Sequence, residues 1–249
     1  MTQPTRDRSA WLHGPQTPCN LEGLEKKRAY HIVLLGAPGV GKGTQAELLC
    51  EALGTCHLST GDVFRAAKCA ASQGLTPAME AALGHMQRGE LVPDETVIEM
   101  VRERLGCLTC ECGFLLDGFP RTVAQAEALE QMLGEAGLTL DAVLNYDLAI
   151  DKVVERLSGR RTCRQCKSTF HVVMKPPARE GVCDKCGGEL YQREDDRPES
   201  VRVRLEAYER STAPLAEFYS RAGLLVTVPA DGSPEEVFAR AMELLKQRG

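Results

Sequence analysis

The chain has 249 residues, of which 43% are hydrophobic and 26% are charged, the balance of an ordinary globular protein. Its net charge of −5 at pH 7 argues against non-specific binding of nucleic acid. No apolar run reaches the ~18 residues of a membrane helix, and residues 1–29 lack the apolar core of a secretory signal. We therefore expect a cytoplasmic protein that binds no membrane and whose residues 1–29 form a flexible extension.

A glycine-rich loop follows the first apolar run of the chain. Residues 36–44 read GAPGVGKGT and stand between a predicted strand and a predicted helix. Glycine lets the backbone curl and point several N–H groups at one concavity, while Lys42 and the helix dipole add positive charge. Gly43 separates Lys42 from Thr44, which departs from the common GxxxxGK[ST] form. The order of strand, loop and helix still predicts a nucleotide phosphate site.

From Tyr30 onward, apolar runs alternate with helical patterns, which predicts an α/β fold with a parallel sheet. The predicted strands are Tyr30–Leu35, Thr55–Ser59, Phe114–Leu116, Ala142–Leu148 and Leu224–Val228. The predicted helices are Thr44–Leu53, Pro77–Arg88, Asp94–Leu105, Val123–Gly134, Lys152–Gly159, Ser200–Arg221 and Pro234–Gln247. Ser233 and Glu236 predict a capping box at the start of the last helix. Residues 162–191 break the alternation and are expected to form an inserted module.

An aspartate ends one of these predicted strands. Asp117 is expected at the carboxyl edge of the sheet, where α/β folds bind their ligands. There it is suited to anchor a hydrated Mg²⁺ between phosphates. Arg121 follows after a Phe119-Pro120 turn, and it forms either a buried ion pair with Asp117 or a phosphate contact.

Several polar residues near the start of predicted helices match capping patterns. Ser59 or Thr60 is suited to cap the helix that follows it, and Asp94 the next one. Thr122 and Gln125 have the spacing of a capping box. A capping role for Gln125 is compatible with a ligand contact by the same side chain.

Two CxxC pairs lie in the inserted module. They are Cys163 with Cys166 and Cys183 with Cys186, with sixteen residues between the pairs. Each pair can form a knuckle, and two knuckles supply four thiolates for a tetrahedral Zn²⁺. Because protein thiolates fill all four positions, this zinc site is expected to be structural. The alternative is a set of four buried free thiols.

The chain has eleven cysteines, an odd count that favours metal binding over a disulfide framework. A third CxxC, Cys107 with Cys110, has no second pair and is predicted to bind no metal, as is the adjacent Cys112. The alternative is a second metal site or a redox role. The remaining cysteines are predicted to be isolated packing or surface thiols. They are Cys19, Cys50, Cys56 and Cys69.

Together these motifs resemble those of the adenylate kinases. Four segments carry the resemblance, in the order 36–44, 59–65, 89–94 and 113–121, the last reading GFLLDGFPR. The resemblance implies a P-loop core with five parallel strands and flanking helices, an inserted helical AMP-binding unit and a zinc-ribbon-like lid. The implied boundaries are 30–58, 93–159 and 194–249 for the core, 59–92 for the AMP unit and 160–193 for the lid. The implied reaction is Mg-ATP + AMP ⇌ 2 ADP, catalysed by a monomer.

The resemblance also implies roles for individual residues. ATP is expected to contact Gly39, Val40, Gly41, Lys42, Gly43, Thr44, Arg156, Arg160, Thr169 and Phe170. AMP is expected to contact Thr60, Arg65, Glu90, Leu91, Val92, Gly118, Phe119, Pro120, Arg121, Gln125, Arg193 and Arg204. The residues expected to act in the transfer itself are Lys42, Asp117, Arg121, Arg160, Arg193 and Arg204. Phosphoryl transfer needs positive charge near the phosphate oxygens more than it needs a general base. His171 is therefore not expected to be catalytic, and a structural hydrogen bond is expected for its side chain.

Two other functions remain open from the sequence. One is a different nucleoside monophosphate kinase, either GTP:AMP or UMP/CMP. Gln125 and the four-cysteine lid count against UMP/CMP, whereas the donor base is only weakly specified. The other is a P-loop ATPase or switch whose zinc ribbon binds nucleic acid. The ribbon has only Phe170 and Tyr191 as aromatic residues, which disfavours that role. Gly-Phe-Pro-Arg follows Asp117, where an ATPase would carry an acidic residue to direct water.

Overall fold

A computed structural model of the protein describes residues 28–67, 75–87, 92–103, 105–109 and 111–248. The predictions for the N-terminal extension, Cys69, Glu90, Leu91 and Cys110 therefore lie outside the described residues. The side chains of Arg65 and Cys107 lie outside them as well. None of the described helices is long and apolar enough to cross a membrane.

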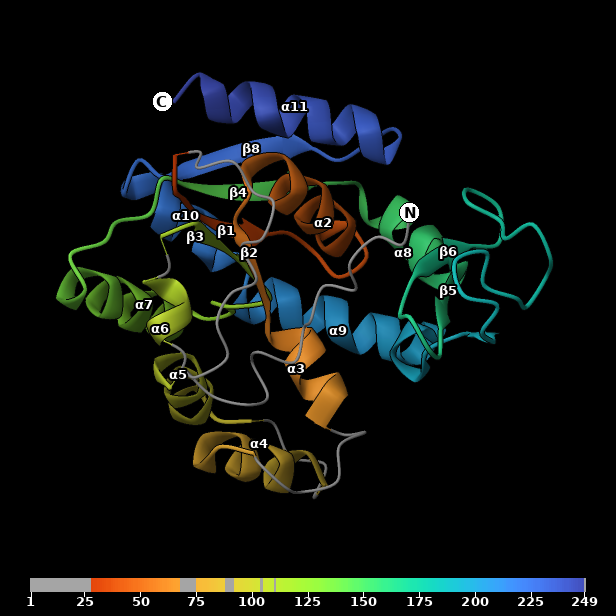
Figure 1. The fold of residues 1–249 in the computed structure, drawn as a ribbon, viewed down its shortest axis with the longest axis horizontal. Coiled ribbons are helices and arrows are strands. Elements are labelled where there is room, and N and C mark those ends of the chain that lie inside the picture. Colours follow the sequence, from red (N-terminus) through yellow and green to blue (C-terminus); the bar gives the residue numbers. More distant parts are fainter. Residues whose placement is uncertain (1–27, 68–74, 88–91, 104, 110, 249) are drawn as a thin grey trace.

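A parallel sheet in the order β2-β3-β1-β4-β8 forms the centre of the described fold (Figure 1). Its strands are β1 (Tyr30–Leu35), β2 (Cys56–Ser59), β3 (Gly113–Asp117), β4 (Ala142–Asp147) and β8 (Leu225–Pro229). In the register of the sheet, Ile32 of β1 lies between Leu115 and Ala142. The predicted α/β fold is confirmed, and the strand ends differ from prediction by at most one residue.

Helices cover both faces of the sheet. The described helices are α2 (Lys42–Leu53), α3 (Thr60–Ala67), α4 (Pro77–Gln87), α5 (Asp94–Arg102), α6 (Leu105–Leu108), α7 (Val123–Glu135), α8 (Ile150–Ser158), α9 (Pro198–Ser211), α10 (Pro214–Arg221) and α11 (Pro234–Lys246), with a 3-10 turn η1 at Glu194–Asp196. Helices α2 and α11 pack on the face that presents Leu34 and Leu144. The opposite face, with Val33 and Leu116, shares a second core with α3, α4, α5, α7 and α10, in which α4 packs on α5 rather than on the sheet. Burial on both faces explains why the strands appear in the sequence as continuous apolar runs.

Two helix predictions are wrong in extent. The predicted helix Ser200–Arg221 is two helices, α9 and α10, because Pro214 has no N–H to continue the ladder. The N–H groups of Thr212 and Ala213 both donate to the carbonyl of Tyr208, which closes α9. Helix α5 ends at Arg102, so the predicted Asp94–Leu105 helix is too long. The predicted capping box of Ser233 and Glu236 is present.

The predicted module, residues 162–191, interrupts the α/β alternation as predicted. We use the name lid for residues 160–193, which contain a second, antiparallel sheet. Strand β5 (Arg160–Cys163) lies between β6 (Thr169–His171) and β7 (Leu190–Tyr191). In Figure 1 the lid projects from one end of the molecule, α3 and α4 extend from another side, and α9 runs from the sheet toward the lid. The hydrophobic core of the lid contains only four buried residues, Cys163, Phe170, Cys183 and Leu190. A core this small gives the lid little stability of its own.

Candidate active site

The glycine-rich loop joins β1 to α2 at the carboxyl edge of the sheet. Gly36, Gly39 and Gly41 have φ angles of 131, 89 and 107°, which L side chains rarely adopt. A Cβ at Gly36 would lie 2.5 Å from the carbonyl oxygen of Tyr146, and one at Gly39 would lie 2.5 Å from Cγ of Leu157. The tight curl of this loop therefore requires glycine for its backbone angles and for its packing.

Lys42 begins α2 and folds back over this loop. Its Nζ donates to the carbonyls of Gly36 at 2.6 Å and Ala37 at 3.0 Å. These bonds use two of the three donors of the ammonium group. Burial lowers the pKa of Lys42 to about 8, and the nearby Asp117 carboxylate opposes that shift only in part. The positive charge of Lys42 is therefore held in a place that favours an anionic ligand.

Asp117 ends β3 next to the first turn of α2. A Cβ at the exposed Gly43 would lie 3.9 Å from Oδ2 of Asp117, and Thr44 in the same turn is also exposed. Nε2 of His57 lies 3.8 Å from the same Oδ2. Burial alone would raise the pKa of Asp117, but His57 and Lys42 lower it below its usual value. The carboxylate is therefore ionised, and His57 is a neighbour that the sequence did not predict.

A second cluster forms at the ends of β2 and β3. The buried Thr60 donates its hydroxyl to the carbonyl of Gly118 at 2.8 Å, and Nε of Arg121 donates to the same oxygen at 2.8 Å. Gly118 has φ 84°, and a Cβ there would lie 2.8 Å from Oγ1 of Thr60. Phe119 is fully buried and joins Pro120 through a cis peptide bond. The structure thus brings together these residues predicted to contact AMP.

The buried Gln125 lies beside this cluster. Its Nε2 donates to Oδ1 of Asp94 at 2.6 Å, and its Oε1 accepts from the main-chain N–H of Arg121 at 2.8 Å. Thr122 caps α7 by accepting from the N–H of Gln125. The Gln125 side chain bonds to Asp94 and Arg121 and does not reach back to the N–H of Thr122. Only the Thr122 half of the predicted capping box is therefore present. The prediction that Asp94 caps α5 is wrong, because its carboxylate accepts from Thr122 and Gln125 instead.

Two adjacent carboxylates hold three of the predicted arginines. Arg160 pairs with Asp196 through Nε and Oδ2 at 2.7 Å, and Arg193 pairs with Asp195 through Nε and Oδ1 at 2.8 Å. Nη1 of Arg204 lies 3.2 Å from Asp195 and 3.5 Å from Asp196. Asp196 is completely buried. Three cations held by two carboxylates leave a net positive charge, which suits an anionic substrate.

Arg156 lies outside this arginine cluster and links two loops. Its guanidinium donates to the carbonyl of Val40, in the glycine-rich loop, at 3.0 Å. It also donates to the carbonyl of Ala230 at 3.0 Å. Arg156 therefore ties the phosphate loop to the turn after β8. Arg161 turns back to the neighbouring main chain, where its Nη1 donates to the carbonyl of Arg160 at 2.8 Å.

The remaining predicted ATP contacts lie on β6 of the lid. Thr169 is exposed. Phe170 is only 5% exposed and packs in the lid core with Cys163, Cys183 and Leu190. The side chain of Phe170 is therefore not available to contact ATP, and only its main chain can do so. Residues 90–92 are predicted to contact AMP through their backbone, and only Val92 of them is described. Val92 is half-buried and packs against the core that includes residues of α5.

His171 makes the structural hydrogen bonds that the sequence analysis expected. Its Nδ1 accepts from the main-chain N–H groups of Val173 and Met174 at 3.1 and 3.0 Å. Its Nε2 lies 3.3 Å from the carbonyl of Glu155. A Cβ at Gly159 would lie 2.2 Å from the same ring nitrogen. The ring therefore packs directly on the joint between α8 and β5.

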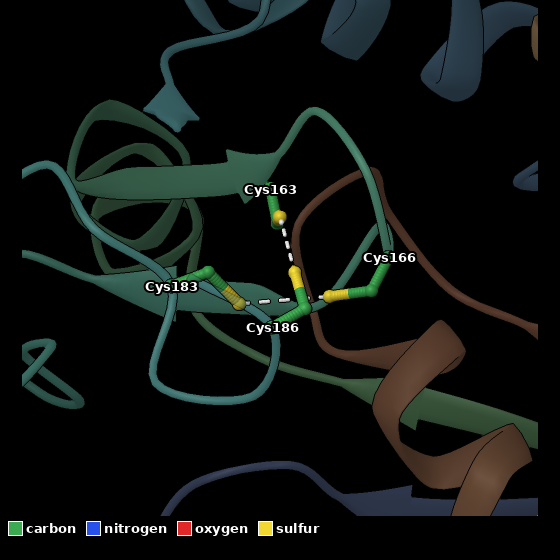
Figure 2. A group of neighbouring side chains, drawn as sticks. All are labelled: Cys163, Cys166, Cys183 and Cys186. Atoms are coloured by element: carbon green, nitrogen blue, oxygen red, sulfur yellow. Dashed lines mark hydrogen bonds between the residues drawn. The ribbon is translucent and has the colours of Figure 1, made fainter. Parts of the chain in front are cut away.

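The side chains of Cys163, Cys166, Cys183 and Cys186 converge in the lid (Figure 2). All four sulfur atoms lie within 4.8 Å of one another, with separations of 3.4 Å for Cys163–Cys186 and 3.5 Å for Cys166–Cys183. Thiolates bound to one tetrahedral zinc at about 2.3 Å lie about 3.8 Å apart. The donor set and its spacing therefore fit a structural zinc ion.

Two other cysteines meet outside the lid. The sulfur atoms of Cys56 and Cys112 lie 3.3 Å apart, so the prediction that Cys56 is isolated is wrong. They are distant in sequence and meet because β2 pairs with β3. Cys50 is buried in α2, as expected of a packing thiol.

Comparison with known proteins gives a consistent result. A family model described as adenylate kinase matches residues 34–224. The adenylate kinase of Carboxydothermus hydrogenoformans is 52% identical over 216 residues, which cover 87% of this chain and 99% of that protein. The chain belongs to the adenylate kinase family. The adenylate kinases of Bacillus licheniformis and Bacillus subtilis are 52% and 51% identical over 219 and 215 residues. They match 88% and 86% of this chain, and 99% and 97% of their own lengths.

The family assignment settles the class of the protein. Adenylate kinases are ATP:AMP phosphotransferases, so the chain is a kinase and binds nucleotides. The resemblance noted in the sequence is confirmed, and the ATPase-switch alternative is set aside. The described site supplies the elements that such a transfer requires, namely a phosphate loop, an ionised aspartate and a cluster of arginines.

Proposed function

We propose that the protein transfers a phosphoryl group reversibly from Mg-ATP to AMP at the carboxyl edge of its parallel sheet. One observation carries the proposal. The phosphate loop with Lys42, the carboxylate of Asp117 and the cluster of Thr60, Gly118 and Arg121 all lie at the ends of the neighbouring strands β1, β2 and β3. This arrangement can hold two phosphate-bearing substrates side by side.

On the donor side, the backbone N–H groups from Gly39 to Thr44 and the ammonium of Lys42 bind the ATP phosphates. Arg156 lies against this loop and is suited to stack on the adenine of ATP. Thr169 and the main chain of Phe170 approach the donor from the lid. Mg²⁺ enters with ATP, and Asp117 holds the water shell of that ion.

On the acceptor side, Thr60 and residues 118–121 surround the AMP molecule. Arg65 and the backbone of residues 90–92 complete this site, as the resemblance implies. Gln125 meets the edge of the adenine base. The polar partners of Thr60 and Gln125 support this assignment, since they hold both side chains in place before the substrate arrives.

For the transfer itself, Arg121, Arg160, Arg193 and Arg204 neutralise the charge that develops on the phosphate oxygens. Asp195 and Asp196 hold three of these arginines together. No general base is required, because the AMP phosphate is already an anion at neutral pH.

The lid (residues 160–193) and the AMP unit (59–92) close on the core and expel water, which prevents hydrolysis of ATP. The four cysteines hold a structural Zn²⁺ that supplies much of the folding energy of the lid. All four ligand positions are filled by thiolates, so the ion takes no part in the transfer. We further propose that the protein is a cytoplasmic monomer.

A coupled assay with Mg-ATP and a panel of acceptors tests the substrate assignment. AMP, GMP, CMP, UMP or no acceptor is added in turn, and ADP formation is recorded. The proposal predicts substantial turnover with AMP alone. Preference for CMP or UMP would keep the transfer mechanism and overturn the assigned role of Gln125.

A further inference from the structure

The side-chain amide of Gln125 is held at both ends. Nε2 donates to Oδ1 of Asp94 at 2.6 Å, and Oε1 accepts from the main-chain N–H of Arg121 at 2.8 Å. The other carboxylate oxygen of Asp94 accepts from the hydroxyl of Thr122 at 2.7 Å. Gln125 is only 4% exposed, so water cannot easily replace these partners. Helices α5 and α7 are thus joined at the place where the amide is fixed.

The chemistry of the two partners decides which way the amide faces. A carboxylate only accepts hydrogen bonds, and a main-chain N–H only donates. If the amide turned over, its oxygen would face the Asp94 carboxylate and its NH₂ group would face the N–H of Arg121. Both contacts would be repulsive in a buried place. Asp94 and Arg121 therefore leave a single orientation available to Gln125.

The fixed amide still has binding capacity. A glutamine amide has two N–H donors and two acceptor lone pairs, and the bonds to Asp94 and Arg121 use one of each. One donor and one acceptor therefore remain for a ligand. Adenine presents N1 as an acceptor and its N6 amine as a donor, which complements this pair. A 6-oxopurine presents the reverse, with N1–H as a donor and O6 as an acceptor.

We propose that Asp94 is a positioning residue that sets the base preference of the acceptor site, by fixing the Gln125 amide in the orientation that suits adenine and rejects 6-oxopurines. Asp94 contacts no substrate and acts through Gln125. This inference rests on the proposed function, in which Gln125 meets the acceptor base. A site that leaves polar groups unpaired with the wrong base discriminates strongly against it.

The test compares AMP with inosine monophosphate as acceptors. Asp94→Ala removes the acceptor for Nε2, so the amide can populate both orientations. The ratio of kcat/KM for AMP to kcat/KM for inosine monophosphate is expected to fall about tenfold, because a buried hydrogen bond loses its partner. The change should appear mainly as a higher KM for AMP, with kcat little altered.

Two further variants separate this role from a general effect of charge on α5. Glu95→Ala removes the neighbouring exposed carboxylate from the same helical turn and should leave the ratio unchanged. Asp94→Asn keeps an oxygen that can accept from Gln125 while its amide donates to Thr122. This variant should keep most of the ratio that Asp94→Ala loses. A merely structural effect of Asp94→Ala would instead lower kcat/KM for both acceptors and leave their ratio as in the unsubstituted protein.

The outcomes distinguish this inference from the proposed function. An unsubstituted protein that forms no ADP from ATP and AMP would refute the proposed function itself. An active protein in which Asp94→Ala folds and keeps the original ratio would overturn the inference alone. If Asp94→Ala does not fold, nitrogen NMR of the unsubstituted protein decides. A Gln125 side-chain amide proton protected from solvent exchange is expected, and rapid exchange of both protons would refute the role of Asp94.

Discussion

Lys42 shows how one residue can couple nucleotide binding to pH. Burial lowers its pKa to about 8 in the folded protein, from 10.5 in an unperturbed chain. The unfolded chain therefore binds more protons between these values, and the free energy of unfolding rises with pH across that window. Below pH 8 the ammonium is charged in both states, and its burial costs stability. Phosphates beside Nζ would favour the charged form and offset this cost.

Binding of ATP at a pH of about 8.5 should therefore take up a fraction of one proton. Calorimetry in buffers of different ionisation enthalpy measures this uptake directly. Lys42→Met should abolish it. Binding enthalpies that do not depend on the buffer in the unsubstituted protein would contradict the assigned position of Lys42 beside the phosphates.

Arg121 is proposed to contact the phosphate that is transferred. Arg121→Ala should lower kcat by roughly 10²–10⁴-fold, since donors aimed at developing charge contribute this much to a transition state. The melting temperature should change little. Arg102→Ala is the matched control, because Arg102 is an exposed arginine on α5 paired with Glu99, and its removal should leave kcat intact. A folded Arg121→Ala protein with unchanged turnover would refute the role.

The residues that the sequence could predict are those whose type and spacing have a direct chemical meaning. Glycine at positive φ, a lysine after it and paired CxxC knuckles are examples. Asp94 was predicted only as a helix cap, and its two side-chain partners lie 28 and 31 residues away. His57, Asp195 and Asp196 were likewise missed as site residues. Whether a carboxylate caps a helix or binds a neighbour depends on which elements pack together, and local patterns do not specify that.

At the scale of elements, the joint between α8 and the lid depends on a glycine. A Cβ at Gly159 would lie 2.2 Å from the His171 ring, so Gly159→Ala should displace that ring and weaken the joint. Overpacking of this kind costs about 1–3 kcal/mol in the free energy of unfolding. Gly134→Ala is the control, because nothing lies within 4 Å of a Cβ there and alanine favours the helix. Urea denaturation should separate the two variants, and equal stabilities would contradict the account.

The lid should depend on the proposed zinc ion for folding but not for chemistry. Removal of zinc by a chelator, or Cys163→Ser, should make the lid sensitive to proteases and lower the melting temperature. Still-folded, metal-free protein should retain measurable turnover. Cys112→Ser, outside the four-cysteine group, should keep one equivalent of zinc. Complete loss of activity in folded, metal-free protein would show that the ion does more than stabilise the lid.

Elements were easiest to predict where burial dominates. The strands are buried on both faces, so their apolar runs mark their ends to within one residue. Helix ends were less certain, because Pro214 divides a pattern that remains amphipathic across the break. Leu105–Leu108 forms a separate short helix, although the pattern of Asp94–Leu105 is continuous in the sequence.

At the scale of the whole molecule, the site results from the order of strands. Strand β1 lies between β3 and β4, which places the phosphate loop next to Asp117 although many residues separate them in sequence. Alternating strands and helices predict a parallel sheet but do not specify this order. The convergence of the loop, the carboxylate and the arginines is therefore a property of the topology rather than of any single motif.

The central claim is that the protein transfers a phosphoryl group to AMP while it excludes water. Phosphorus NMR of a mixture of protein, Mg-ATP and AMP tests this most directly, because it resolves ATP, AMP, ADP and inorganic phosphate together. The account predicts that two ADP molecules form for each ATP and AMP consumed, with no inorganic phosphate released. Release of phosphate from ATP in the absence of AMP, at a comparable rate, would contradict it.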